Sequence, residues 1–234
     1  MASLNNENLI GLYDRTEKLI GSDAIDKLKN AKVLVVGLGG VGGYIVEALA
    51  RAGVGKLGLC DFDVVDVTNL NRQILATVPK IGQKKTEVAK DRVLSINPNC
   101  DVEIFDFRLD LNRLTELSIQ NWTFIADAID DTGAKIGLIQ AAYENNIPIV
   151  CSMGTGNKLD PFGYKIVPIE KTEGDPLARS IRKQLKDLKI KGIPVLFSPE
   201  KGVAEITYGI PTISYMSAVA GLEIASYIIK EIIK

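Results

Sequence analysis

The chain has 234 residues, 46% of them hydrophobic and 24% charged, and its formal net charge is −1. This composition is ordinary for a globular protein. The near-zero net charge excludes attraction to nucleic acid over the whole surface, though not through a local basic patch. There is no histidine, which excludes nucleophile–histidine pairs, histidine metal ligands and imidazole acid–base catalysis. Any chemistry must therefore use carboxylates, Lys and Arg side chains, backbone N–H groups or a bound metal ion.

The three cysteines, Cys60, Cys100 and Cys151, include no C-x-x-C pair. We therefore expect neither a disulfide framework nor a structural zinc site, and a reducing, cytoplasmic setting fits best. The first 15 residues lack the pattern of a signal peptide. The apolar C-terminal segment is interrupted by Glu223, and we predict a buried helix there, with peripheral contact to a membrane as the less favoured alternative.

Taken in chain order, the sequence predicts two short helices within residues 1–30, the second capped by Ser22, and then alternating strands and helices. The predicted strands are 31–37, 56–61, 101–107, 122–130 and 147–153. The predicted helices between them are 41–53, 83–97, 111–117 and 134–146. This alternation is typical of a doubly wound α/β fold with a mainly parallel sheet, whose ligands bind where the strands end.

After residue 151 the alternation changes. A turn-rich segment at 154–163 precedes a strand at 164–169, a basic amphipathic helix at 175–189, a strand at 193–200 and the long last helix. No internal repeat or linker is present. We expect one domain over residues 1–234, with a nucleotide-binding half at about 1–151 and an elaborated half at about 152–234 for substrate and dimer contacts.

A glycine motif lies between the first predicted strand and its helix. Gly37, Gly39 and Gly42 fit G-x-G-x-x-G, which permits a tight turn and close approach of the backbone to a phosphate at a helix N-terminus. Asp61, at the end of the second strand, is placed to accept hydrogen bonds from a ribose. The motif predicts an adenine nucleotide and leaves NAD, FAD and ATP open.

The polar residues that follow favour ATP. Asn69 and Arg72 lie shortly after the second strand, and Lys84 and Lys85 open the next helix. Fixed cations suit a triphosphate better than a hydride acceptor, although for each cation taken alone a solvated surface charge is the better interpretation. At the end of the fourth strand a carboxylate could hold Mg²⁺ between phosphates. Asp131, rather than Asp130, suits the N-cap of the following helix.

Four ordered segments carry a family resemblance: "GLGGVGGYIVEALARAGVG", "DFDVVDVTNLNRQ", "GQKKTEVAKDRVLSINP" and "DAIDD". From about Tyr13 to the last helix the chain resembles the E1-like adenylating superfamily of ThiF, MoeB and HesA proteins, which implies a Rossmann-like, E1-like adenylating fold. In the second half, "GTGNKLDP", "DPLARSIRKQLK" and "VLFSPE" resemble the tRNA threonylcarbamoyladenosine dehydratases of that superfamily. The implied reaction is ATP-dependent dehydration, with ring closure, of threonylcarbamoyladenosine at position 37 of tRNA.

The resemblance also implies a site for ATP and Mg²⁺. Glycines cradle the phosphates, one aspartate holds the ribose, a second carboxylate lies nearby, and polar or charged side chains grip the triphosphate. The corresponding residues are Gly37, Gly39, Gly40, Gly42, Asp61, Asp63, Asn69, Arg72, Lys85 and Asp130.

Catalysis, by the same resemblance, belongs to Arg72, Lys85 and Asp130, with Asp130 also the Mg²⁺ ligand. Arg15 matches an arginine that reaches the ATP site from the partner subunit of a homodimer. Such groups act by positioning and by neutralising charge as pyrophosphate leaves, which requires no histidine.

Two departures from the wider superfamily narrow the substrate. Many relatives carry a pair of C-x-x-C zinc motifs, which this chain lacks, and E1 enzymes proper use a nucleophilic cysteine. Cys151 is better interpreted as a core thiol. The first alternative function is adenylation of the C-terminus of a small ubiquitin-like sulfur carrier. Beside tRNA and a second copy of the chain, a cysteine desulfurase or sulfur-acceptor system is a further candidate partner of the protein. An NAD-dependent oxidoreductase and a non-catalytic nucleotide-binding scaffold are further alternatives.

The segment from Lys171 to Lys191 is the expected contact with tRNA. Seven basic residues outnumber three acidic ones there, and contacts to phosphates supply salt-dependent affinity. A solvated helix face is the competing interpretation. The residues assigned to tRNA are Arg179, Arg182, Lys183 and Lys186.

Overall fold

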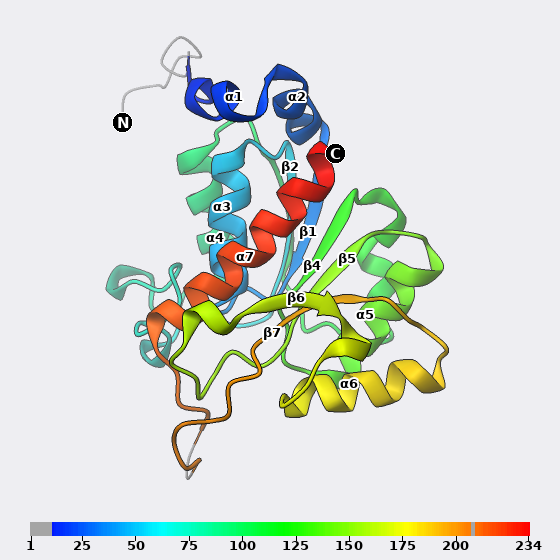
Figure 1. The fold of residues 1–234 in the computed structure, drawn as a ribbon. Coiled ribbons are helices and arrows are strands. Elements are labelled where there is room, and N and C mark those ends of the chain that lie inside the picture. Colours follow the sequence, from blue (N-terminus) through cyan, green and yellow to red (C-terminus); the bar gives the residue numbers. More distant parts are fainter. Residues whose placement is uncertain (1–10, 207–208) are drawn as a thin grey trace.

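The computed structural model describes residues 11–206 and 209–234 (Figure 1). The strands in these residues are β1 (Lys32–Val36), β2 (Lys56–Cys60), β3 (Asp101–Phe105), β4 (Phe124–Asp127), β5 (Ile149–Ser152), β6 (Lys165–Pro168) and β7 (Pro194–Phe197). They form one sheet in the order β3-β2-β1-β4-β5-β7-β6, in which every neighbouring pair is parallel except β6 with β7. The predicted doubly wound, mainly parallel sheet is confirmed.

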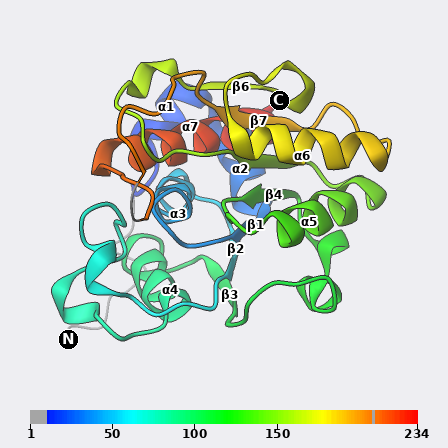
Figure 2. The ribbon, with the colours of Figure 1, turned by 90° about the horizontal axis from the view of Figure 1, so that it is seen from below.

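Helices cover both faces of this sheet. They are α1 (Asp14–Ile20), α2 (Ser22–Asn30), α3 (Gly42–Ala52), α4 (Lys85–Ile96), α5 (Thr132–Glu144), α6 (Pro176–Asp187) and α7 (Ser214–Ile233). Figure 2 shows α3, α4 and α7 on one side of the strands and α5 and α6 on the other. The molecule therefore has two apolar cores, one on each face of the sheet.

Strand β1, in the interior of the sheet, shows why both faces are covered. Along β1, Val33 and Val35 belong to the core beneath α3 and α7, whereas Leu34 and Val36 belong to the core beneath α5 and α6. Successive side chains of a strand point to opposite faces, so an uninterrupted apolar run has to be buried on both. This is the pattern of a parallel sheet between two helical layers.

The last helix is buried along one face, as predicted. Met216, Ala220, Ile224 and Ile228 recur every four residues and are completely buried, which is the spacing of one helical face. Within the described ranges, no helix combines the length and apolarity needed to cross a membrane.

Two local predictions need correction. Ser22 is the first residue of α2 rather than its cap; Gly21 takes the N-cap position with φ +87°, where a side chain would be strained. The helix predicted at 111–117 is a short 3₁₀ turn, Leu114–Leu117. Residues 1–10, which belong to the segment without a signal-peptide pattern, lie outside the described residues.

The strand order reverses between β1 and β4, where Val36 is in register with Asp127. The loops that leave the carboxyl ends of two such strands turn away in opposite directions and leave a crevice between them. In Figure 1 this end of the sheet lies at the bottom, whereas α1, α2 and the C-terminus lie at the opposite end.

Candidate active site

A cleft of about 990 Å³ occupies the crevice at the carboxyl ends of the strands. Its lining comes from both halves of the chain, including the glycine loop after β1, the loops after β2 and β4, and the segment that follows β5. The structure brings together nine of the predicted residues in this lining: Gly37, Gly39, Gly40, Asp61, Asp63, Asn69, Arg72, Lys85 and Asp130.

The glycine loop is shaped by two steric requirements. Gly37 has φ +91°, and a Cβ there would lie 2.7 Å from the Ala128 carbonyl oxygen; a Cβ at Gly42 would lie 1.7 Å from the Gly37 carbonyl oxygen. Gly39 differs, since the nearest atom to its Cβ position is Gln73 Nε2 at 3.9 Å. Gly37 and Gly42 therefore build the loop, and Gly39 leaves open space above it. That space, at the N-terminus of α3, fits a phosphate group.

Asp61 ties the glycine loop to the loop after β2. Its Oδ2 accepts a hydrogen bond from the Leu38 N–H at 2.6 Å, and its Oδ1 accepts one from the Asp63 N–H at 2.9 Å. Each carboxylate oxygen has two lone pairs, so each retains one with which to accept a hydrogen bond from a ribose hydroxyl. The carboxylate is thus fixed in place by backbone groups before any ligand arrives.

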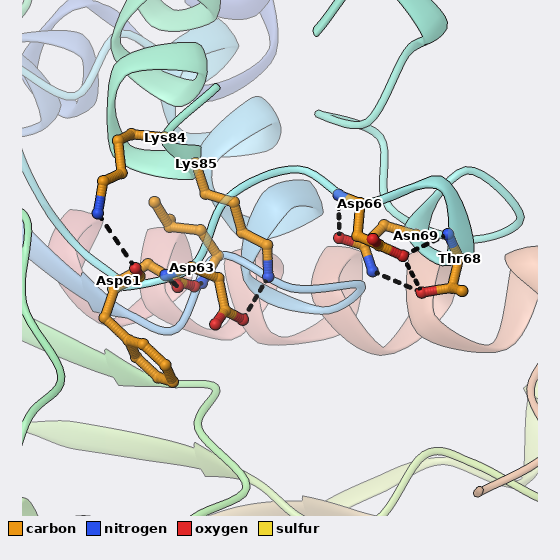
Figure 3. A network of polar contacts seen from close by, with 9 residues as sticks. Asp61, Asp63, Asp66, Thr68, Asn69, Lys84 and Lys85 are labelled. Atoms are coloured by element: carbon orange, nitrogen blue, oxygen red, sulfur yellow. Dashed lines mark hydrogen bonds and ion pairs between the residues drawn. The ribbon is translucent and has the colours of Figure 1, made fainter. Parts of the chain in front are cut away.

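Lys85 is the most buried cation of the predicted set. Its Nζ donates to Asp63 Oδ2 at 2.8 Å while its side chain is only 5% exposed. Figure 3 shows this contact beside Lys84, which instead points to the Phe62 carbonyl. A charged hydrogen bond of this kind pre-positions the ammonium group. A triphosphate entering the cleft would compete with Asp63 for the same ammonium.

Asn69 and Arg72 are held by the turn that follows β2. Asn69 Oδ1 accepts a hydrogen bond from the Asp66 N–H in a capping box (Figure 3). Arg72 Nη1 donates to the Thr68 carbonyl at 2.8 Å and to Asn71 Oδ1 at 3.0 Å. Within residues 11–206 and 209–234, Arg72 forms no ion pair. Its charge is therefore oriented by neutral oxygens and available to an anion.

The two adjacent aspartates after β4 have different surroundings. Asp131 caps α5 as predicted: its Oδ1 accepts from the Ala134 N–H at 3.0 Å, and its Oδ2 pairs with Arg108. The hydrogen bond from Ala134, with that from Arg108, lowers the pKa of Asp131. The exposed Asp130 has no hydrogen bond or ion pair from its side chain to any described residue, so its carboxylate is available at the cleft wall.

This donor set fits Mg²⁺ brought in with a nucleotide. Mg²⁺ is usually held by one or two carboxylates together with substrate phosphates and water, rather than by a dedicated protein cage. The part of the chain that the structure describes has no cluster of three or more His, Cys, Asp or Glu side chains suited to a metal. Asp130 is the carboxylate that would bind such an ion.

Arg15 lies apart from the other predicted residues. It is exposed on α1, at the end of the sheet opposite the cleft (Figure 1). The folding of a single chain therefore does not bring Arg15 to the cleft, and any contact with the nucleotide has to come from a second subunit.

The cysteines are core residues. Cys60 and Cys151 are almost completely buried. Burial raises the pKa of Cys60 to about 12 and raises that of Cys151 well above its ordinary value. A thiol held in its protonated form is a poor nucleophile, which supports the interpretation of Cys151 as a core thiol.

The basic helix begins at the cleft. Asp175 and Pro176, at the start of α6, belong to the cleft lining. Arg182 differs from the other predicted tRNA contacts, because it is partly buried and its Nη1 donates to the Thr172 carbonyl at 2.7 Å and to Thr172 Oγ1 at 2.6 Å. The remaining three are exposed at spacings of four and three residues, on one face of the helix: Arg179, Lys183 and Lys186.

The far wall of the cleft was not predicted. Lys158, only 8% exposed, donates from Nζ to the Ser198 carbonyl at 2.8 Å and to the Glu200 carbonyl at 3.0 Å. The Glu200 carboxylate accepts from the Leu159 N–H in return. Two segments far apart in the sequence are thereby joined into one wall. The segments "GTGNKLDP" and "VLFSPE" contain the residues of this wall, but neither segment indicates that these residues meet.

Named relatives and solved structures are similar to this chain. The tRNA threonylcarbamoyladenosine dehydratase of Bacillus subtilis is 38% identical over 82% of this chain and 76% of its own length. The E. coli enzyme of the same name is 39% identical over 74% of this chain and 65% of its own length. Crystal structures of E. coli TcdA, that dehydratase, in complex with AMP and with ATP each have a TM-score of 0.89; they cover 94% of this chain and 92% and 93% of their own, at 35% and 34% identity.

A family model gives the broader placement. The model of the ThiF family matches residues 13–234, which is nearly the whole chain and agrees with the resemblance found from about Tyr13. The chain therefore belongs to the ThiF family, in the branch that contains the tRNA threonylcarbamoyladenosine dehydratases.

Proposed function

We propose that this protein is an ATP-dependent dehydratase that cyclises threonylcarbamoyladenosine at position 37 of tRNA. The observation that carries the proposal is the cleft at the strand ends, which is lined by the glycine loop, Arg72, Lys85 and Asp130. The dehydratase of B. subtilis and the ATP complex of the E. coli enzyme support the same reaction and the same nucleotide.

The reaction begins with attack of the threonyl carboxylate on the α-phosphate of ATP. Pyrophosphate leaves, and an acyl adenylate forms. An internal nucleophile of the threonylcarbamoyl group then attacks the activated carbonyl, loses its proton and expels AMP as the ring closes. The oxygen lost from the substrate leaves on AMP, so the overall change to the nucleoside is loss of one water.

The protein contributes to this reaction by neutralising the charge of the ATP phosphates and by positioning the α-phosphate for attack. Arg72 and Lys85 are placed to bind phosphate oxygens, and Asp61 to hold the ribose so that the α-phosphate stays fixed while the carboxylate approaches. Asp130 would hold Mg²⁺, whose chemistry is to neutralise the phosphates. Arg15 of the partner subunit of a homodimer would add a further positive charge, since Arg15 of the same chain lies at the other end of the sheet.

Both halves of the chain serve this reaction within one proposed domain. Residues 1–151 would bind the nucleotide, and residues 152–234 would supply substrate and dimer contacts. The exposed face formed by Arg179, Lys183 and Lys186 starts beside the cleft, so tRNA phosphates bound there would lie near the reacting nucleotide.

Charge reversal tests this surface. The variant R179E/K183E/K186E leaves Arg182 and its contact with Thr172 intact. We expect weaker tRNA binding with a reduced salt dependence, because cations that displace counterions have been removed, and unchanged ATP affinity. The matched control K29E/K230E/K234E makes the same change in net charge at the opposite end of the sheet. Equal tRNA affinity in the two variants and the wild type would exclude the α6 face.

The choice of substrate is tested by release of AMP. Wild-type protein with ATP and Mg²⁺ should release AMP when tRNA carrying threonylcarbamoyladenosine is added, and not when unmodified tRNA is added. Stimulation by a small carrier protein ending in Gly-Gly, with none by the modified tRNA, would support the alternative adenylation instead.

A further inference from the structure

Beneath the cleft lies an ion pair that takes no part in the proposed chemistry. Asp127, the last residue of β4, and Lys135, in α5, are both completely buried, with Nζ 2.7 Å from Asp127 Oδ2. Neither residue belongs to the lining of the cleft. Taking two charges out of water is costly, and buried ion pairs are often no better for stability than apolar residues of the same size. Stability alone is therefore a weak reason for this pair.

The Asp127–Lys135 pair links three elements next to the cleft: β4, β5 and α5. Lys135 Nζ also donates to the Ser152 carbonyl at 3.1 Å, at the end of β5. Asp127 Oδ1 accepts from the Ile129 N–H at 3.1 Å, in the loop after β4. One ammonium group thus fixes the ends of β4 and β5 relative to α5.

Both fixed segments line the cleft. Ala128 and Ile129 pack against the glycine loop: the Ala128 N–H donates to the Val36 carbonyl at 2.8 Å, and the space beside Gly37 is closed by the Ala128 carbonyl and the Ile129 side chain. The next residue is Asp130, which the proposed function assigns to Mg²⁺. On the other side, Ser152 begins the cleft lining contributed by the second half of the chain.

We propose that Lys135 is a positioning residue for the nucleotide site. Through Asp127, Lys135 fixes the position of the 128–130 segment. Through the Ser152 carbonyl, it fixes the distance between that segment and the cleft lining that follows β5. The role of the 128–130 segment in holding Mg²⁺·ATP rests on the proposed function. The pair itself touches neither nucleotide nor metal, and it acts through the backbone that carries Asp130 and closes the glycine loop.

The main test is the variant D127N/K135M, which replaces both charges with neutral side chains of similar size. No unpaired charge then remains in the core, so the protein is expected to fold. Two quantities are measured on the purified full chain: the melting temperature, and the dissociation constant for ATP by calorimetry with and without Mg²⁺. We expect a melting temperature near that of the wild type and an affinity for Mg²⁺·ATP weaker by about 10-fold or more, as for the loss of support to a metal ligand.

A matched control separates positioning from stability. Glu47 is another buried carboxylate, paired with Arg92 at 2.8 Å, and neither residue lines the cleft. The variant E47Q should melt at a lower temperature and bind ATP like the wild type. A folded D127N/K135M variant that also binds Mg²⁺·ATP like the wild type would overturn the positioning role.

A second variant keeps the inference testable if D127N/K135M does not fold. In D127N/K135Q both side chains are neutral amides that can donate and accept hydrogen bonds, so no unpaired charge is left in the core. The ammonium group that contacts both Asp127 and the Ser152 carbonyl is absent, and we expect the same loss of Mg²⁺·ATP affinity. Wild-type affinity in folded D127N/K135Q would contradict the inference. The test of Lys135 is separate from the test of the proposed function. If the wild-type protein binds ATP but leaves the modified tRNA unchanged, the dehydratase reaction is refuted. The ATP affinities of the variants still test the positioning role of Lys135.

Discussion

Gly42→Ala tests how the phosphate loop is built. The added Cβ would lie 1.7 Å from the Gly37 carbonyl oxygen, so α3 and the loop must separate by roughly 1.5–2 Å before the contact becomes an ordinary one. Alanine gains about 1 kcal/mol over glycine within a helix, whereas overpacking a closely packed site costs about 1–3 kcal/mol. A net loss of stability is expected, together with a displaced phosphate cradle.

Gly39→Ala is the matched substitution within the same motif. Its Cβ would have no neighbour closer than 3.9 Å, so the fold should accept it and the melting temperature should stay near that of the wild type. The methyl group would occupy the open space at the cleft and hinder approach of a phosphate to the backbone. We expect an ATP affinity reduced roughly tenfold or more, equivalent to about 1.4 kcal/mol.

The assay measures thermal unfolding and ATP binding by calorimetry on both variants and the wild type. We expect Gly42→Ala to lose both stability and ATP binding, because a displaced loop no longer presents its backbone N–H groups to the phosphate. Gly39→Ala should lose ATP binding alone. Wild-type ATP affinity in Gly42→Ala, or equal destabilisation in the two variants, would show that Gly42 and Gly39 do not have these separate roles in the loop.

Further predictions concern the carboxylates and thiols. Asp130→Ala should melt like the wild type and lose ATP-dependent turnover. If this variant is as active as the wild type, Asp130 is not the residue that holds Mg²⁺. Burial alone would raise the pKa of Glu47, but hydrogen bonds from Arg92 and Arg51 lower it overall. The ion pair of Glu47 therefore stabilises the fold fully at pH values above the ordinary glutamate pKa of 4.5, and this stabilisation is lost as the pH falls through the lower folded-state pKa. The melting temperature of E47Q should fall less on acidification than that of the wild type. An equal fall in both proteins would count against a stabilising role for this ion pair. Cys151→Ala should retain turnover, and a complete loss would revive a nucleophilic role.

The fold was accessible from the sequence because its signals are local. Apolar runs such as 33–36 alternate with helical segments, and this alternation alone indicates a doubly wound sheet. Much of the site was accessible for the same reason. Asp61 and Asp130 each follow a strand, and parallel strands end at one edge, so distant residues were placed together without knowledge of their contacts.

The remaining features depend on contacts that leave no local pattern. Lys135 lies in an apolar helix and is eight residues from Asp127, so nothing in the sequence indicates that the two are paired beneath the cleft. Lys158 reaches carbonyls 40 and 42 residues away, between loops without periodicity. Arg182 belongs to a basic stretch, yet in the folded chain its guanidinium group donates a hydrogen bond to the Thr172 carbonyl. Long-range polar contacts of this kind are set by the tertiary fold rather than by composition.

In the proposed function, this protein removes water from threonylcarbamoyladenosine in tRNA at the expense of ATP. The most direct measurement is mass spectrometry of nucleosides from modified tRNA incubated with the protein, ATP and Mg²⁺, with ATP omitted in a parallel sample. We expect the modified adenosine to lose the mass of one water only when ATP is present. An unchanged nucleoside, from folded protein that binds ATP, would contradict it.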